Sequence, residues 1–200
     1  MLAGAAFAAG GHHAVDDAAI LEAGQCEVEG WASRAPAGDR LLHAGLGCRA
    51  GPVELGVAAE AARQGGSQAA YGLSAKWAQA LGEDLSVGAS IGPNWQAHAA
   101  PRYQGFTVAA LATWTPREDL ALHLNLGRDI VHRGRGLARH GLAAEWLPVQ
   151  DWSFVAERYR KSAATSGAPA PAGRSPRTGA RTSATRIGCA ARACRTGRSA

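Results

Sequence analysis

Four cysteines are the residues whose spacing suggests chemistry most directly, and they fall into two pairs. Cys26 and Cys48 lie symmetrically about a turn centred near residue 37, so strands paired across that turn would set them opposite each other. In an oxidising compartment this arrangement predicts a cross-strand disulfide, and the alternative is two unpaired small side chains. Cys189 and Cys194 have a C-x4-C spacing with no second pair, which does not make a zinc site.

A second group carries metal-binding side chains close together near the N-terminus: His12, His13, Asp16 and Asp17. Imidazole and carboxylate suit divalent ions. These residues precede the first expected strand, in a polar segment over 11–24, so solvated side chains are the simpler interpretation. We predict neither a metal site nor any other cofactor.

The remaining histidines offer little catalytic chemistry. His98, His132 and His140 are assigned to the longer loops, where they would be solvated or contact a ligand. His123 could serve as a general base, but the expected strand pairing sets no serine or aspartate beside it. The sequence contains no glycine-rich phosphate loop, Cys/His cluster or nucleophile elbow. We therefore expect no enzyme; the alternative is an enzyme acting on lipid or peptide, with His98 at the rim of a barrel.

Composition and charge narrow the function classes. The chain has 200 residues, enough for one domain with a core, and 46% of them are hydrophobic. The net charge of +5 arises after Tyr159, where eight arginines and Lys161 occur without any acid. The preceding residues carry twelve basic and sixteen acidic groups. This distribution argues against a basic nucleic-acid-binding domain, and the lack of 18 consecutive apolar residues excludes a transmembrane helix.

The elements that would position these residues are β-strands. Leu120, Leu122, Leu124 and Leu126, for example, alternate with smaller or polar residues, and this period of two is typical of strands. We predict an all-β fold, an antiparallel up-and-down meander of about nine strands that forms an incomplete transmembrane β-barrel. The expected strands are 25–33, 40–50, 53–62, 69–80, 85–96, 105–115, 120–130, 137–147 and 152–161.

The connections alternate between short turns and longer loops, the layout of an outer-membrane barrel. A weak W-x-P-x-x-D repeat begins at Trp114 and at Trp146, with a looser copy at Trp77. Turns centred on 117 and 149 would set Trp114 opposite Leu120 and Trp146 opposite Trp152. At the short-turn end, Trp77, Trp114, Trp146 and Trp152 would then form an outward aromatic girdle; alternatively they cap a soluble core.

The two faces of the strands separate a membrane barrel from a soluble one. One face is rich in Leu, Val, Ile and Trp, and the other is small and polar, which is typical of a lipid-facing band around a polar lumen. The alternative is a soluble lipocalin-like barrel or sandwich with its apolar face inward, binding a small apolar ligand. The predicted lumen-lining residues are Glu54, Glu60, Lys76, His123, Asn125 and Glu145.

Both ends of the chain differ from the strand region at 25–161. Residues 1–10 are like the last part of a secretory signal peptide, with Ala6-Phe7-Ala8 as a cleavage motif; the alternative is an Ala/Gly leader. Residues 162–200 contain Ile187 as the sole large aliphatic side chain, so a disordered basic tail is expected. Either this tail meets an anionic partner, or it is an out-of-frame translation.

From Gly11-His-His-Ala-Val-Asp-Asp-Ala-Ala-Ile-Leu-Glu-Ala-Gly-Gln-Cys-Glu-Val-Glu29 through Glu157-Arg-Tyr159, the chain resembles outer-membrane β-barrel proteins of Gram-negative bacteria, porin- or transporter-like. The resemblance implies export to the bacterial outer membrane, contact with its lipid and with the barrel-assembly machinery, and about twelve strands in all. This chain departs from the family pattern because it lacks a final aromatic strand residue. The resemblance therefore implies a barrel truncated or frameshifted after about residue 160.

The expected function is a non-enzymatic outer-membrane pore or transporter-like protein, without nucleic acid as a partner. A structural or assembly-defective fragment is a further alternative.

Overall fold

The computed structural model describes residues 14–34, 40–63, 67–132, 134–149 and 152–163. Cys189, Cys194, His12, His13 and the expected signal-peptide and tail segments lie outside these residues. Nine strands make up the described fold. They are β1 (Cys26–Arg34), β2 (Arg40–Ala50), β3 (Val53–Arg63), β4 (Ser67–Ala80), β5 (Leu85–Gln96), β6 (Tyr103–Arg117), β7 (Leu120–Val131), β8 (Leu137–Val149) and β9 (Trp152–Ala163).

These bounds confirm all nine expected strands, each to within about two residues at either end. Every strand is antiparallel to the next, and the order in the sheet is the order in the chain. The meander was predictable because period-two patterning and turn residues repeat along the whole region. Among the described residues, no helix has the length and apolar character needed to span a membrane.

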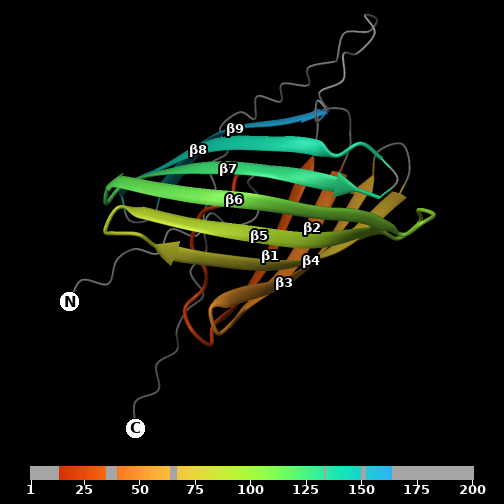
Figure 1. The fold of residues 1–200 in the computed structure, drawn as a ribbon, viewed down its shortest axis with the longest axis horizontal. Coiled ribbons are helices and arrows are strands. Elements are labelled where there is room, and N and C mark those ends of the chain that lie inside the picture. The colour runs from red at the N-terminus through yellow and green to blue at the C-terminus, as the bar shows by residue number, and fades with distance from the viewer. Residues whose placement is uncertain (1–13, 35–39, 64–66, 133, 150–151, 164–200) are drawn as a thin grey trace, which may run out of the picture.

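The sheet curls into a half-barrel. In Figure 1, β5–β9 form one curved layer, and the first strands cross behind it at a different angle. Within the described residues β1 and β9 do not pair, so both are sheet edges. Short turns join strands at one end of the half-barrel, and loops such as 97–102 join them at the other.

Two β-bulges correct the expected hairpin registers. Trp114 pairs with Leu122 rather than Leu120, because the register shifts between Trp114 and Arg117. Trp146 likewise pairs with Phe154 rather than Trp152, across a shift between Trp146 and Val149. In each case the turn is tighter than expected and the bulge absorbs the extra residues. A shift of two residues leaves every side chain on its expected face.

Each bulge contains the proline of the W-x-P-x-x-D repeat, Pro116 or Pro148. Proline has no N–H for the strand ladder, so bulges and edges are where a sheet tolerates it. The repeat also links successive hairpins. The carbonyl of Asp84 accepts from the N–H of Thr115, and that of Asp119 accepts from Leu147 N–H, both at 2.8 Å.

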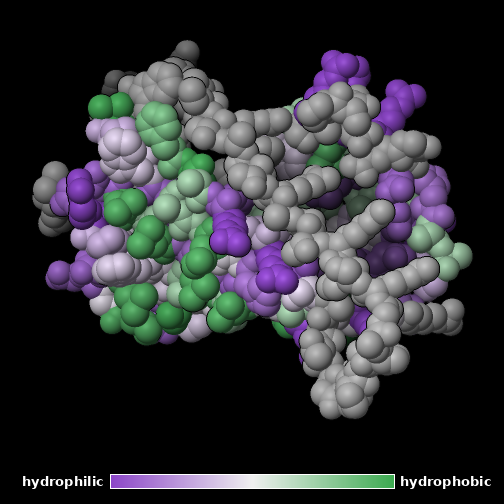
Figure 2. Space-filling model, turned by 90° about the horizontal axis from the view of Figure 1, so that it is seen from above, coloured by the Kyte–Doolittle hydropathy of each residue, from purple (hydrophilic) through white to green (hydrophobic). Residues whose placement is uncertain are grey.

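The concave and convex faces differ sharply in chemistry. Buried positions of β6–β8 all belong to the concave face, and the set includes His123, Asn125 and Glu145. On the convex face, Val28, Leu73 and Leu142 keep 81%, 52% and 59% of their surface exposed. Figure 2 shows apolar side chains gathered in a broad patch over one half of that view. The apolar face is therefore the outer one.

Candidate functional site

The concave face is occupied by the chain's own residues 14–25, here called the inner segment. In Figure 1 this segment, in red, passes between the layer of β5–β9 and the first strands. Val15 is 1% exposed and Ala18 is 2% exposed. Gly141 on β8 makes room for Val15, because a Cβ atom at this glycine would lie 2.5 Å from the Val15 Cγ2 atom. Asp16 and Asp17 therefore belong to the interior, which corrects the expectation of a solvated leader.

Side chains of the wall bind the backbone of the inner segment. An extended strand would satisfy its N–H groups on a neighbouring strand, but here carboxylates and a hydroxyl on β9, β6 and β3 accept them. The hydrogen bonds run from Ala14 and Val15 N–H to Glu157 Oε2 (2.8 and 3.4 Å), from Ala18 N–H to Thr113 Oγ1 (2.8 Å), and from Leu21 N–H to Glu54 Oε2 (3.0 Å).

Asn125 on β7 adds a two-point contact. In the amide orientation that satisfies both of its polar atoms, Nδ2 donates to the carbonyl oxygen of Asp16 at 2.7 Å. Its Oδ1 accepts from the N–H of Asp16 at 2.6 Å. This side chain therefore mimics a neighbouring β-strand for one residue. At the far end, Arg49 Nη1 donates to the carbonyl of Leu21 at 2.8 Å.

Lys76 on β4 forms the ionic anchor of the inner segment. Its Nζ donates to Asp17 Oδ1 at 2.7 Å and to Asp16 Oδ1 at 2.9 Å. The side chains of Lys76 and Asp17 are 13% and 6% exposed, whereas that of Asp16 keeps 45% exposure to the interior space. Burial within the half-barrel raises the pKa of the Asp16 carboxyl, and the Lys76 ammonium opposes that rise.

A buried polar cluster lies beneath the inner segment. Thr113 Oγ1 is 2.9 Å from His123 Nδ1, and His123 Nε2 is 3.8 Å from Glu145 Oε2. Among the described residues, His123 Nε2 and Glu145 Oε2 have no hydrogen-bond partner. Hydroxyl, imidazole and carboxylate are the groups of a nucleophilic triad. However, the Thr113 hydroxyl already accepts from Ala18, and the inner segment covers it.

A cavity of about 510 Å³ lies beside the inner segment. Its lining includes Asp16, Glu27, Glu54, Lys76, Arg139 and Tyr159. Asp129 organises the long-loop end of this interior, because it accepts from Arg139 Nη1 at 3.0 Å and from Thr107 Oγ1 at 2.8 Å. Lys161 Nζ lies 3.1 Å from the other carboxylate oxygen of Asp129. The interior is thus polar and charged on both sides of the inner segment.

All six residues predicted to line a lumen lie on the concave face, although they do not form one cluster. Glu60 stands apart near the edge strands, where His43 Nδ1 is 3.2 Å from its carboxylate. His43 also lies 3.4 Å from Glu29 and stacks on Trp31 with ring centroids 5.0 Å apart. The other five contact the inner segment or lie beneath it: Glu54, Lys76, His123, Asn125 and Glu145.

Three of the predicted girdle tryptophans, Trp77, Trp114 and Trp146, lie on the convex face near the short turns. Trp77, Trp114 and Trp146 are 40%, 51% and 48% exposed, and Trp152 begins β9 opposite Val149. Trp146 Nε1 donates to Asp119 Oδ2 at 3.0 Å. This hydrogen bond, assisted by Arg117, lowers the pKa of the Asp119 carboxyl in the turn.

A second aromatic cluster, which the sequence analysis missed, lies at the long-loop end. The rings of Tyr71, Trp95, Tyr103 and His132 form a continuous chain, with successive centroids 5.7, 6.0 and 5.6 Å apart. His98 is exposed in its loop, as predicted. His140 was expected in a loop but lies on β8, opposite Leu126 and Arg160. No group of three or more metal-binding side chains occurs among the described residues.

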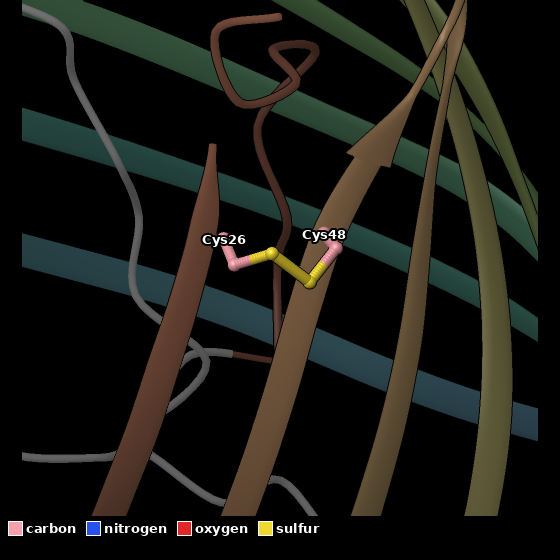
Figure 3. The surroundings of a disulfide bond; sticks show 2 residues. All are labelled: Cys26 and Cys48. Carbon is pink, nitrogen blue, oxygen red and sulfur yellow. A yellow bond between two sulfur atoms is a disulfide. The ribbon is translucent and has the colours of Figure 1, made fainter. Parts of the chain in front are cut away.

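The register of β1 and β2 sets Cys26 opposite Cys48 and Val28 opposite Leu46, as predicted. The structure joins the two cysteines in a disulfide (Figure 3), on the convex face of the edge hairpin.

Replacing both Cys26 and Cys48 with alanine is expected to lower the free energy of unfolding by about 3 kcal/mol, because the disulfide closes a loop of some 22 residues. The check is a denaturant titration with and without dithiothreitol. Reductant should shift the wild-type midpoint towards that of the variant and leave the variant unchanged. An equal shift in both proteins would assign the effect to Cys189 and Cys194 instead.

Thr113 and Glu157 belong to the site but were not predicted from the sequence. Thr113 was missed because the expected strand register was wrong at this position. A turn centred on 117 sets Thr113 opposite Ala121, whereas the bulge sets it opposite His123. Asp129 was detectable, because it shares the strand face of His123 and Asn125.

A family model described as "Uncharacterised conserved protein UCP029691" matches residues 1–187. No curated protein and no solved structure matches the chain.

Proposed function

The chain belongs to the family described as Uncharacterised conserved protein UCP029691, and from its geometry we propose that it is a non-enzymatic outer-membrane β-barrel protein, porin- or transporter-like. In this proposal the convex face contacts lipid, and the concave face borders a lumen that the inner segment partly fills. The observation that carries the proposal is the placement of acids: all seven carboxylates within the strands point to the concave side. They are Glu27, Glu29, Glu54, Glu60, Asp129, Glu145 and Glu157.

Exposed apolar area supports the same orientation. Soluble monomers rarely expose contiguous apolar patches larger than a few hundred Å², yet large apolar side chains recur along the whole convex face. A lipocalin-like barrel would turn its apolar face inward around a ligand. Here the inward face holds ion pairs instead, such as those of Lys76 and Arg139.

The two aromatic clusters support a membrane of ordinary thickness. On β6, Tyr103 belongs to the long-loop cluster and Trp114 to the short-turn cluster. Eleven residues of strand span about 36 Å, or about 28 Å along the normal for a barrel tilt of about 40°. Outer-membrane barrels have an apolar band about 25 Å tall between aromatic girdles.

Membrane fractionation followed by electrophoresis in detergent tests the location. We expect the protein in the outer-membrane fraction, with a faster-migrating folded band that converts to the unfolded position on boiling. Recovery as a soluble monomer would contradict the proposal.

Planar-bilayer recording tests the pore function. Small, discrete conductance steps are expected, because the inner segment fills part of the concave interior, beside a cavity of about 510 Å³. An inserted protein that never conducts would favour a structural role.

An outer-membrane enzyme acting on lipid or peptide is the alternative, and the observation in its favour is the row of Thr113, His123 and Glu145. Release of fatty acid or of peptide fragments by purified protein, lost on Thr113→Ala, would establish that alternative. We expect no such turnover, since the Thr113 hydroxyl already accepts a hydrogen bond from Ala18 N–H.

A further inference from the structure

Basic side chains on the convex face gather near the long-loop end of the strands. Arg34, Arg40 and Arg63 form a row across β1, β2 and β3, and all three are exposed. A second group lies on β7–β9, where His140 is opposite Arg160. We call these residues the convex basic belt: Arg34, Arg40, Arg63, Arg128, His140 and Arg160. Arg158, also convex, lies nearer the middle of the edge strand β9.

The row on β1–β3 brings like charges together. Arg34 is directly opposite Arg40, which is directly opposite Arg63. Side chains in such positions have Cβ atoms about 5 Å apart, and like charges there destabilise a sheet. Within the described part of the chain, no carboxylate pairs with any of the three. The residues that the structure describes provide this row with no counter-charge that would make it favourable.

The opposite end of the strands shows the contrast. There Arg117 donates through Nε and Nη2 to both carboxylate oxygens of Asp119, each at 2.9 Å. Arg117 is thus neutralised at a short turn, whereas among the described residues no carboxylate pairs with Arg34, Arg40 or Arg63. On the convex face, this difference favours an anion from outside the chain at the long-loop end.

The position of the belt identifies the kind of anion. Leu42, 58% exposed, follows Arg40 by two residues on the same face, so the arginines stand where the apolar face ends. Long arginine side chains at such a boundary reach into the headgroup layer of a bilayer. A guanidinium also binds phosphate oxygens in a two-point geometry.

We propose that the convex basic belt binds the phosphate groups of anionic lipid headgroups and thereby fixes the long-loop end in one leaflet. This inference rests on the proposed membrane function. It adds a ligand class, a binding row on β1–β3 and a direction of insertion.

The test compares two triple variants in vesicles of phosphatidylcholine with and without phosphatidylglycerol. Arg34→Gln/Arg40→Gln/Arg63→Gln removes the row on β1–β3, and Arg192→Gln/Arg195→Gln/Arg198→Gln removes equal charge from the C-terminal segment. The folding equilibrium is measured by urea titration. Phosphatidylglycerol should favour folding of the wild type by about fivefold per arginine, or about a hundredfold for the row.

The variant of the β1–β3 row should lose this hundredfold share of the gain, and the control variant should keep it. In pure phosphatidylcholine the β1–β3 row variant should fold at least as well as the wild type, because repulsion between the opposed arginines is relieved. Glycerol phosphate at matched ionic strength should not replace the lipid; if it does, the row binds free phosphate and the lipid proposal is wrong. If phosphatidylglycerol favours folding of the wild type and of the β1–β3 row variant equally, the proposal that these arginines bind lipid phosphate is wrong, while the proposed membrane function stands. Failure of all proteins to insert into either vesicle would overturn the membrane function and the belt together.

Discussion

Replacing Leu73 with lysine is expected to destabilise the inserted protein by about 2–4 kcal/mol, whereas the same change at Leu81 costs about 0–1 kcal/mol. Leu73 lies at the middle of β4 on the convex face, opposite Val57, and is 52% exposed. Leu81 lies just beyond the same strand in a short turn and is 60% exposed. In the proposed orientation, lipid at the midplane would exclude the ammonium group of the new lysine, and the interface would not.

The pair is informative because the two leucines are similarly exposed. In a protein surrounded by water, neither lysine would lose hydration, and both variants would unfold within about 0.5 kcal/mol of the wild type. The measurement is reversible urea unfolding in phosphatidylcholine vesicles, with refolding in detergent as a check on competence. Equal free energies for Leu73→Lys and Leu81→Lys would contradict a lipid-facing convex surface.

Replacing Lys76 with methionine is expected to release the inner segment, at a cost of about 3 kcal/mol. Removing one partner of a buried ion pair leaves an uncompensated charge, which costs roughly 3–5 kcal/mol. The lower figure applies because Asp16 keeps 45% exposure. We expect larger conductance steps and faster proteolysis within residues 14–25, with the disulfide hairpin intact.

Lys161→Met is the matched control for that change. Lys161 is 45% exposed, and its partner Asp129 retains Arg139 at 3.0 Å, so we expect a loss below about 1 kcal/mol and unchanged conductance. Equal effects of the two variants would show that Lys76 does not anchor the inner segment.

The effect of Lys76→Met should also depend on pH. An unpaired carboxylate is unfavourable only while it is ionised, so the difference from wild type should shrink as the pH falls. Because burial raises the pKa of Asp16, this recovery should begin at a higher pH than for an ordinary aspartate. A difference that grows on acidification would contradict this assignment.

Alternation predicted the strands, because each strand of the meander repeats the same apolar-and-polar pattern. It also gave the register of Cys26 with Cys48, where the strands run without a bulge. It failed at Trp114 and Trp146, since a bulge changes the pairing without changing the face. The membrane orientation, like the pore, stays a prediction.

The inner segment escaped prediction for a different physical reason. Its contacts run mainly through backbone N–H groups, which every residue but proline possesses and which leave no pattern in the sequence. Lys76 was the one available sign. Lys76 is the one charged side chain of β4, and Asp16 and Asp17 supply its carboxylate partners from a segment without periodicity.

In the proposed barrel, the nine described strands would cross the membrane an odd number of times. The chain enters β1 at the short-turn side and leaves β9 at the long-loop side, so in the proposed barrel these two strand ends would lie at opposite membrane surfaces. Edge strands β1 and β9 also run in the same direction, so direct closure of one on the other would require parallel hydrogen bonds.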